Sequence, residues 1–128
     1  MVLVDTCGWI EWLTDGPLAD AFRPHLEQTD VLLVPTLVQY ELAKWITRER
    51  DETLALEVIG LTHQARVVAL DTSLALGAAA LALEHRLAMA DAVIYATARA
   101  HGATVVTSDA HFEHLSGVTY LRQHTTPG

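Results

Sequence analysis

The chain has 128 residues, 51% of them hydrophobic, and a formal net charge of -8. This length and apolar content suit one compact domain with a single core, whereas sixteen acidic against eight basic residues exclude a general electrostatic attraction to nucleic acid. The single cysteine, Cys7, excludes an intrachain disulfide and a thiolate metal site.

The sequence predicts no membrane segment and no secretory signal. Its longest apolar run, residues 74–83, is about half of the roughly 20 residues that a bilayer span requires. No basic region or small-residue cleavage site accompanies the amino terminus. We therefore expect a soluble, cytoplasmic protein.

Short β-branched runs alternate along the chain with longer helical patterns. The predicted strands are residues 2–4, 31–34, 67–70, 103–107 and, more weakly, 118–121. The predicted helices are residues 6–13, 18–28, 36–50, 52–64, 72–86 and 90–101. Strands separated by helices need crossover connections, so the pattern predicts an α/β fold in which helices cover both faces of a parallel sheet.

Local signals mark the ends of several of these elements. Asp51 and Asp71 suit helix N-caps, Pro17 and Pro35 suit helix starts, and Gly102 suits a C-terminal stop. The Ala-rich residues 74–83 are expected to form a packed helix rather than a functional tract.

Two aspartates follow predicted strands directly. Asp5 ends the run 2–4, and Asp109 comes after the run 103–107. Ligands bind at the carboxyl ends of strands in open parallel sheets. However, Asp is also a good N-cap, so position alone leaves both interpretations open.

Glu41 interrupts the apolar face of its predicted helix. At 100° per residue it falls between Leu37 and Trp45, on the face that also carries Val38, Leu42 and Ile46. A carboxylate buried there needs a cation, a hydrogen-bonding cage or a raised pKa. The alternative is a Glu at the edge of the stripe, paired with Lys44 or with the indole N–H of Trp45.

Asp91 lies in the first turn of its predicted helix, on the same face as Ile94, Tyr95 and Ala98. An ordinary first-turn Asp is the alternative to a functional role, because a helix N-terminus stabilises negative charge. Asp71 also follows an apolar strand, so burial and position do not separate it from the other acids.

Four segments resemble the PIN-domain ribonucleases, and among them the small VapC-type toxins of prokaryotic toxin-antitoxin pairs. They occur in the family's order at residues 2–10, 38–42, 89–98 and 105–112, and each contains one of the acids Asp5, Glu41, Asp91 and Asp109. No segment is specific alone, but four in order are much more so. By resemblance these four form the family's acidic cluster, and Asp71 falls at an ordinary strand-to-helix junction.

The resemblance implies a single PIN domain over residues 1–128, with a PIN-like three-layer α/β/α sandwich and a mostly parallel sheet of four to five strands. It implies the toxic component of a type II toxin-antitoxin pair, a Mg²⁺- or Mn²⁺-dependent endoribonuclease that hydrolyses RNA phosphodiester bonds with a metal-activated water. Asp5 and Asp91 are our choice for direct ligands. Glu41 and Asp109 then hold metal-bound waters or a second ion, and Thr6 and Thr107 orient these groups or serve only as structural hydrogen-bonding partners.

The chain departs from the family pattern at two positions. Cys7 stands where these toxins often have Ser, and His111 stands where many have a further acid. His111 and His114 have a spacing that zinc ligands also show, but a third strong local ligand is lacking. We therefore interpret the pair as a solvated turn at the rim of the site.

The resemblance also implies a VapB-like antitoxin that wraps a groove beside the active site, and homodimerisation through helices. Trp9, Trp12 and Leu13 share one face of the first helix, and Trp45 lies in another apolar face. Core packing is the expected role of most of these side chains, although exposed aromatics would suit the antitoxin. An RNA substrate would have to be attracted by bound cations or by a local group such as Lys44, Arg48 and Arg50.

Three alternatives belong to other classes of function. A phosphoacceptor receiver domain would want an acidic pair after its first strand and a Lys after its last, but Asp5 precedes Thr6 and the only Lys is Lys44 in a helix. The other two are a PIN-fold RNA-processing nuclease outside a toxin pair and a catalytically silent PIN binding module. The presence of all four matched acids argues against the silent module.

Overall fold

The computed structural model describes residues 1–122, which form five strands and six α-helices. The strands are β1 (Val2–Val4), β2 (Leu32–Pro35), β3 (Arg66–Val68), β4 (Thr104–Thr107) and β5 (Val118–Tyr120). The helices are α1 (Thr6–Leu13), α2 (Ala19–Glu27), α3 (Thr36–Glu49), α4 (Glu52–Thr62), α5 (Thr72–His85) and α6 (Met89–Ala100), and two short 3₁₀ turns, η1 (Thr29–Val31) and η2 (Ala110–Phe112), complete the set. The sequence therefore predicted the type and order of every strand and α-helix, with ends misplaced by at most two residues.

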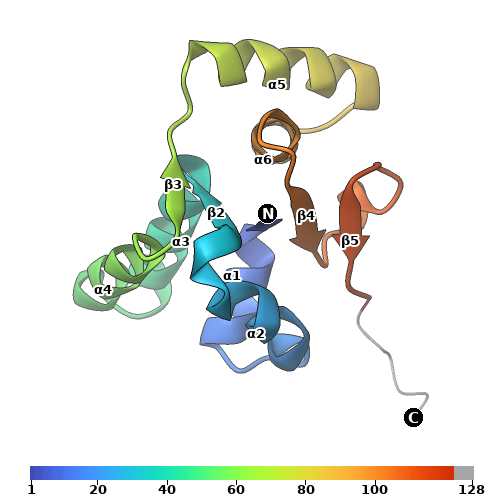
Figure 1. Cartoon of the computed structure of the whole chain (residues 1–128). Helices are drawn as coiled ribbons and strands as arrows, with labels where there is room; N and C mark the ends of the chain where they lie inside the picture. The colour runs from blue at the N-terminus through green and yellow to red at the C-terminus, as the bar shows by residue number, and fades with distance from the viewer. Residues whose placement is uncertain (123–128) are drawn as a thin grey trace.

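All neighbouring strands pair in parallel, in the order β3-β2-β1-β4-β5. Along the chain, β2 is added beside β1 and β3 beside β2, all in one direction across the sheet. The connection from β3 then returns to the other side of β1, where β4 pairs. Because such crossovers are right-handed, α1 to α4 cover one face of the sheet while α5 and α6 cover the other (Figure 1). This is a three-layer α/β/α sandwich with a fully parallel five-stranded sheet, as the sequence predicted.

The strand order reverses between β1 and β4, which pair side by side. Their register sets Leu3 opposite Val105 and Val4 opposite Val106. The residue that follows β1, Asp5, continues this pairing by donating its backbone N–H to the carbonyl of Val106 at 3.0 Å. In open α/β sheets, the carboxyl edge at such a switch point is the usual place for a ligand.

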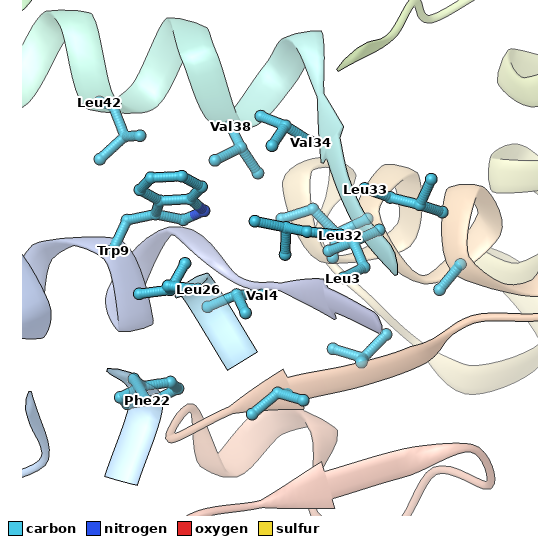
Figure 2. Close-up of a cluster of buried hydrophobic side chains, with 14 of the residues drawn as sticks. Leu3, Val4, Trp9, Phe22, Leu26, Leu32, Leu33, Val34, Val38 and Leu42 are labelled. Carbon is cyan, nitrogen blue, oxygen red and sulfur yellow. The ribbon is translucent and has the colours of Figure 1, made fainter. Parts of the chain in front are cut away.

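The main core lies between the sheet and its helices. Leu3, Val4, Leu32, Leu33 and Val34 point from the strands into a cluster of buried side chains (Figure 2). Trp9 from α1, Phe22 and Leu26 from α2, and Val38 and Leu42 from α3 pack against them in the same view. The core thus fixes α1 and α3 beside the carboxyl ends of β1 and β2.

The helix ends mostly follow the predicted signals. The side chains of Asp51 and Asp71 accept hydrogen bonds from the backbone N–H of Leu54 and Leu74, which makes both N-caps. Pro35 directly precedes α3, and Gly102 follows α6 with a φ of +63°. Pro17 stands two residues before the first residue of α2 instead of opening it.

The Ala-rich segment forms α5, as predicted, but it packs less completely than expected. In α5 only Leu74 and Ala78 are buried, because the helix lies on α6 rather than on the sheet (Figure 1). Leu76 and Leu83 are exposed by 69% and 86%. An apolar helix therefore borders solvent on its outer side.

Within residues 1–122, no helix is both long enough and apolar enough to cross a bilayer.

Candidate functional site

Three parallel strands and helix α6 bring the four predicted acids to the carboxyl end of the sheet. Asp5 follows β1, Asp109 follows β4 after one intervening residue, and Glu41 lies in α3, which begins where β2 ends. Asp91 lies in the first turn of α6. The charges of Asp91 and Asp109 act on Asp5, and those of Asp109 and Glu41 act on Asp91. The structure thus gathers residues from four distant segments, and we call Asp5, Glu41, Asp91 and Asp109 the acidic cluster.

Asp5 lies deepest in the acidic cluster, with 6% of the residue exposed. Its carboxylate accepts hydrogen bonds from the backbone N–H of Thr6 at 2.8 Å and from the hydroxyl of Thr107 at 2.9 Å. Burial raises the pKa of the Asp5 carboxyl to about 6, and the charges of Asp91 and Asp109 add to this rise against the two hydrogen bonds. Asp5 is both the N-cap of α1 and a member of the cluster, so the two interpretations of its position are compatible.

Glu41 is half-buried in the first half of α3. Its Oε1 accepts a hydrogen bond from the Thr6 hydroxyl at 2.7 Å. Glu41 pairs with neither Lys44 nor Trp45 in the described residues 1–122. Lys44 Nζ lies 5.9 Å from the centroid of the Tyr40 ring instead, and Trp45 makes no hydrogen bond to Glu41. The carboxylate is therefore directed toward Asp5 and α1.

Asp91, Asp109 and His111 come close together at the outer side of the cluster. His111 Nδ1 lies 3.4 Å from Asp91 Oδ2 and 3.3 Å from Asp109 Oδ1. One potential ligand atom from each of the three lies within 4.8 Å of the others. Burial raises the pKa of the Asp91 carboxyl, the charge of Asp109 adds to the rise, and His111 opposes it. These three groups are close enough to share one ion.

His111 corrects part of the sequence interpretation. Its side chain is 75% exposed and lies in a turn at the rim of the site, as His114 also is exposed, but its ring is close to two acids, whereas His114 is not part of the group. The cause is the short turn η2, in which the Asp109 carboxylate caps the backbone N–H of His111 at 2.9 Å. An Asp followed two residues later by His was the available signal, since the cap brings the second side chain back to the first.

The hydroxyl groups of Thr6 and Thr107 make hydrogen bonds to members of the acidic cluster. The fully buried Thr107 hydroxyl donates to Asp5 and accepts from the backbone N–H of Asp109 at 2.9 Å. Thr6 uses its backbone for Asp5 and its hydroxyl for Glu41. Each threonine therefore links two parts of the cluster.

Cys7 packs within this network but shows no sign of reactivity. Its Sγ lies 3.5 Å from Thr107 Oγ1 and accepts a hydrogen bond from Ser108 at 3.4 Å. Burial and the charge of Asp5 raise the pKa of the Cys7 thiol. The thiol thus remains neutral, which suits a small packing residue beside a carboxylate.

Asp71 is separated from the cluster by its structural role. Its side chain caps α5 through the backbone N–H of Leu74 at 2.9 Å, and the residue is exposed beyond β3, which is an edge strand of the sheet. The ambiguity between Asp71 and the other strand-end acids is thereby removed.

The donor set fits a hard divalent cation. Carboxylate oxygens dominate it, as Mg²⁺ and Mn²⁺ prefer, and His111 adds one imidazole that suits Mn²⁺ better than Mg²⁺. Burial raises the pKa of the Asp5 and Asp91 carboxyls, and neighbouring carboxylates add to the rise, so both charges are disfavoured without a cation. A bound dication would reverse this penalty.

Comparisons with known proteins agree with this arrangement. The family model described as PIN domain matches residues 2–118. No curated protein sequence matches the chain.

Solved structures resemble the chain over nearly its whole length. A chain of a toxin-antitoxin complex from Klebsiella pneumoniae is 21% identical, with a TM-score of 0.77 over 93% of this chain and 96% of that one. VapC20 from Mycobacterium tuberculosis, a toxin that cleaves the sarcin-ricin loop, is 21% identical, with a TM-score of 0.75 over 95% and 99% of the two chains. A chain of VapBC2 from Rickettsia felis, bound to a DNA fragment from its promoter, is 15% identical, with a TM-score of 0.75 over 97% and 100%. At such low identities the likeness shows a shared fold.

Proposed function

The chain belongs to the PIN domain family, and we propose that it is a metal-dependent endoribonuclease that acts as the toxic component of a type II toxin-antitoxin pair. The observation that carries this proposal is the convergence of Asp5, Glu41, Asp91 and Asp109 at the switch point of the sheet, where Asp5 and Asp91 have raised pKa values. The named activity of the Mycobacterium tuberculosis toxin and the toxin-antitoxin complexes of similar fold support the assignment.

We place the ion on Asp5, Asp91 and Asp109, with His111 as an additional ligand and Glu41 acting through water. When bound, Mg²⁺ or Mn²⁺ lowers the pKa of a water molecule and offsets the charge that develops on the phosphate oxygens of RNA. Thr107 keeps Asp5 aligned with the backbone of Asp109, and Thr6 keeps Glu41 against α1. These contacts preorganise the ligands, so less rearrangement is needed when an ion arrives.

A groove between α1, α3 and α4 suits the proposed antitoxin. It has a volume of about 270 Å³, and its lining is mainly apolar, formed by Leu13, Thr14, Trp45, Ile46, Glu49, Arg50, Leu54 and Val58. Trp45 and Leu13 are partly exposed here, whereas Trp9 is only 2% exposed and belongs to the core. An amphipathic segment of an antitoxin in this groove would lie beside the helix that carries Glu41.

A second apolar surface suits the proposed homodimer. The hollow between α5 and α6 is lined by Leu70, Ala75, Ala78, Ala79, Ala82, Met89, Ala92 and Val93. Leu76, Leu83 and Met89 are exposed around it by 69% to 86%. Exposed apolar patches of this kind mark protein interfaces, and this one lies across the sheet from the antitoxin groove.

The test of the function is expression in a bacterial host that lacks the antitoxin. The native protein should arrest growth and degrade RNA, and Asp5→Asn should do neither. Asp71→Asn is the matched control, because it makes the same change at another strand-end N-cap and should remain toxic. Growth arrest by Asp5→Asn would contradict the proposal. Arrest by the native protein without RNA cleavage would favour a silent binding module.

Toxin and housekeeping nuclease differ in their genetic context. A short upstream reading frame that encodes a DNA-binding protein with a flexible tail would support the toxin. Its absence, together with unimpaired growth on expression of an active nuclease, would favour an RNA-processing enzyme outside a toxin pair.

A further inference from the structure

Two hollows adjoin the acidic cluster, and each contains one of its acids together with basic side chains. The first, about 240 Å³, lies along α3 and includes Glu41, Tyr40, Lys44 and Arg48. The second, about 250 Å³, lies at the turn between α5 and α6 and includes His85, Arg86, Asp91 and His111. The two share no lining residue, but Glu41 of the first and Asp91 of the second are neighbours in the acidic cluster, so a ligand that occupies both passes over it.

The distribution of positive charge is unusual for a chain with a net charge of -8. The chain has eight Lys and Arg residues, and Lys44 is its only lysine. Three of the eight, Lys44, Arg48 and Arg86, line these two hollows. Positive side chains next to a cluster of carboxylates, on a surface that otherwise repels polyanions, provide local sites for phosphate groups.

The α3 hollow combines cations with an aromatic surface. Tyr40, Lys44 and Arg48 follow one another at intervals of four residues and therefore lie on one face of the helix. Tyr40 is 60% exposed, with Lys44 Nζ near its ring. Arg48 pairs with Glu49 at 3.1 Å, but both side chains are exposed and such a pair is weak. An exposed aromatic ring beside cations is a combination that binds single-stranded nucleic acid.

Arg86 occupies an unusual backbone position at the end of α5. Its φ of 55° and ψ of 48° are left-handed, a conformation in which helices usually place glycine. Arg86 lines the same hollow as Asp91 and His111. Arg86→Gly therefore removes the side chain while the new residue suits the left-handed backbone better than arginine does.

We propose that a single strand of RNA crosses the acidic cluster, with its phosphates held by Arg86 on one side and by Lys44 and Arg48 on the other, and with one base stacked on Tyr40. This inference rests on the proposed ribonuclease function and deepens it. A free base for stacking requires an unpaired strand. RNA suits both hollows better than an acidic peptide, because it carries a phosphate at every nucleotide on either side of the bond to be cut.

The test is the binding of a short fluorescent single-stranded RNA, measured by anisotropy at several salt concentrations, with a constant concentration of Ca²⁺ in place of Mg²⁺ or Mn²⁺ so that the cluster holds a cation while cleavage is slowed. Each phosphate contact to a single strand contributes about 0.7 to the slope of log affinity against log salt. Lys44→Gln with Arg48→Gln should therefore weaken binding and reduce the slope by about 1.4. Arg23→Gln with Arg66→Gln removes the same charge from residues that line neither hollow, and it should leave the slope unchanged.

Two further variants separate binding from folding. Arg86→Gly should reduce the slope by about 0.7 while its melting temperature equals or exceeds that of the native protein, because glycine suits the left-handed backbone. Tyr40→Leu should weaken binding roughly tenfold with an unchanged slope, because it removes stacking and no charge.

Two kinds of result would overturn the inference. The inference is overturned if the Lys44/Arg48 and Arg86 variants keep the salt slope of the native protein, or if the native protein does not bind this RNA. The proposed function is tested separately, by growth arrest and RNA cleavage. Unchanged RNA binding with a loss of antitoxin affinity in the Lys44/Arg48 variant assigns the α3 hollow to the protein partner and overturns the inference as well.

Discussion

Thr107 connects two strands of the site through a single hydroxyl group. It ends β4 opposite the residue that follows β1, so its hydroxyl reaches the Asp5 carboxylate while it also accepts the backbone N–H of Asp109. The Thr107 hydroxyl both donates and accepts a hydrogen bond. Its contribution to stability exceeds the sum of the two bonds, because without it each partner would be buried unpaired. The position of Asp5 is thus set by strand register before any metal binds.

The buried Asp5 carboxyl predicts a specific dependence of stability on pH. Its pKa rises from 3.8 in the unfolded chain to about 6 in the folded protein, so the folded state holds the proton more tightly. The free energy of unfolding should therefore fall as pH rises from about 4 to about 6, by as much as about 3 kcal/mol for this group. Asp91, whose pKa is also raised, acts in the same direction.

Urea unfolding between pH 4 and pH 7, with a chelator present, checks this dependence. Asp5→Asn should flatten the curve and be more stable than the native protein at neutral pH. Equal slopes for the two proteins would contradict the burial argument.

His111 predicts a preference among metal ions. If its imidazole joins Asp91 and Asp109 around an ion, His111→Ala should weaken Mn²⁺ binding roughly tenfold or more and affect Mg²⁺ less, since imidazole is a poorer ligand for Mg²⁺. Calorimetry or the electron spin resonance signal of free Mn²⁺ measures both. His114→Ala, two residues beyond η2, is the control and should bind as the native protein does. Tighter Mn²⁺ binding by His111→Ala would instead show that the imidazole competes with the ion.

At the residue scale, the four acids chosen by resemblance lie together in the structure, but the sequence did not indicate all of their neighbours. Burial on an apolar helix face singled out Glu41 from sequence alone, whereas Asp5 and Asp71 looked alike because both follow strands and both cap helices. Only the strand order separates them. The contribution of His111 depends on the shape of the short turn η2, which hydrophobic periodicity does not report.

At the scale of elements, α1 packs unusually closely on its neighbours. A Cβ added at Gly8 would stand 2.5 Å from Val4 Cγ1 and 2.6 Å from carbons of the Phe22 ring. This close approach holds the helix that follows Asp5 against β1 and α2.

We expect Gly8→Ala to destabilise the protein by about 1–3 kcal/mol, because buried ring and strand atoms must move. Gly77→Ala in α5 is the matched control: its Cβ would meet nothing within 4 Å, and it should stabilise by up to about 1 kcal/mol through helix propensity. Chemical denaturation of both variants measures the difference. A Gly8→Ala protein as stable as Gly77→Ala would contradict the close packing.

The elements themselves were predictable because their signals are local. Alternating strand and helix patterns, Asp caps and a glycine stop act over a few residues, and they located every strand and α-helix to within two residues. The packing of α5 was not predictable in the same way. Its Ala and Leu residues are apolar on all sides, so composition indicated burial while the fold covers only one side with α6.

At the scale of the whole molecule, the exposed side of α5 predicts self-association. Leu76→Lys with Leu83→Lys should convert a dimer to a monomer, because two charges would be buried in an apolar interface. Leu56→Lys on α4, at a leucine that is 64% exposed, is the control and should leave the mass unchanged. Light scattering coupled to size exclusion reports the mass. A native protein that is monomeric at all accessible concentrations would contradict the proposed interface.

The proposed function requires an acidic chain to act on a polyanion, and the whole molecule offers a way to do so. Its parallel strands place the acids at one switch point, where their charges need a cation, and the two flanking hollows supply three of the eight basic residues. Under the proposed function, a bound metal and these side chains together would provide the positive potential that the rest of the surface lacks.

The most direct test of this account is RNA cleavage by the purified protein as a function of divalent cation. After chelation the protein should not cut RNA, and added Mg²⁺ or Mn²⁺ should restore cleavage in the native protein but not in Asp91→Asn. Cleavage that persists in excess chelator, or a native rate in Asp91→Asn, would contradict the claim that the acidic cluster works through a bound metal ion.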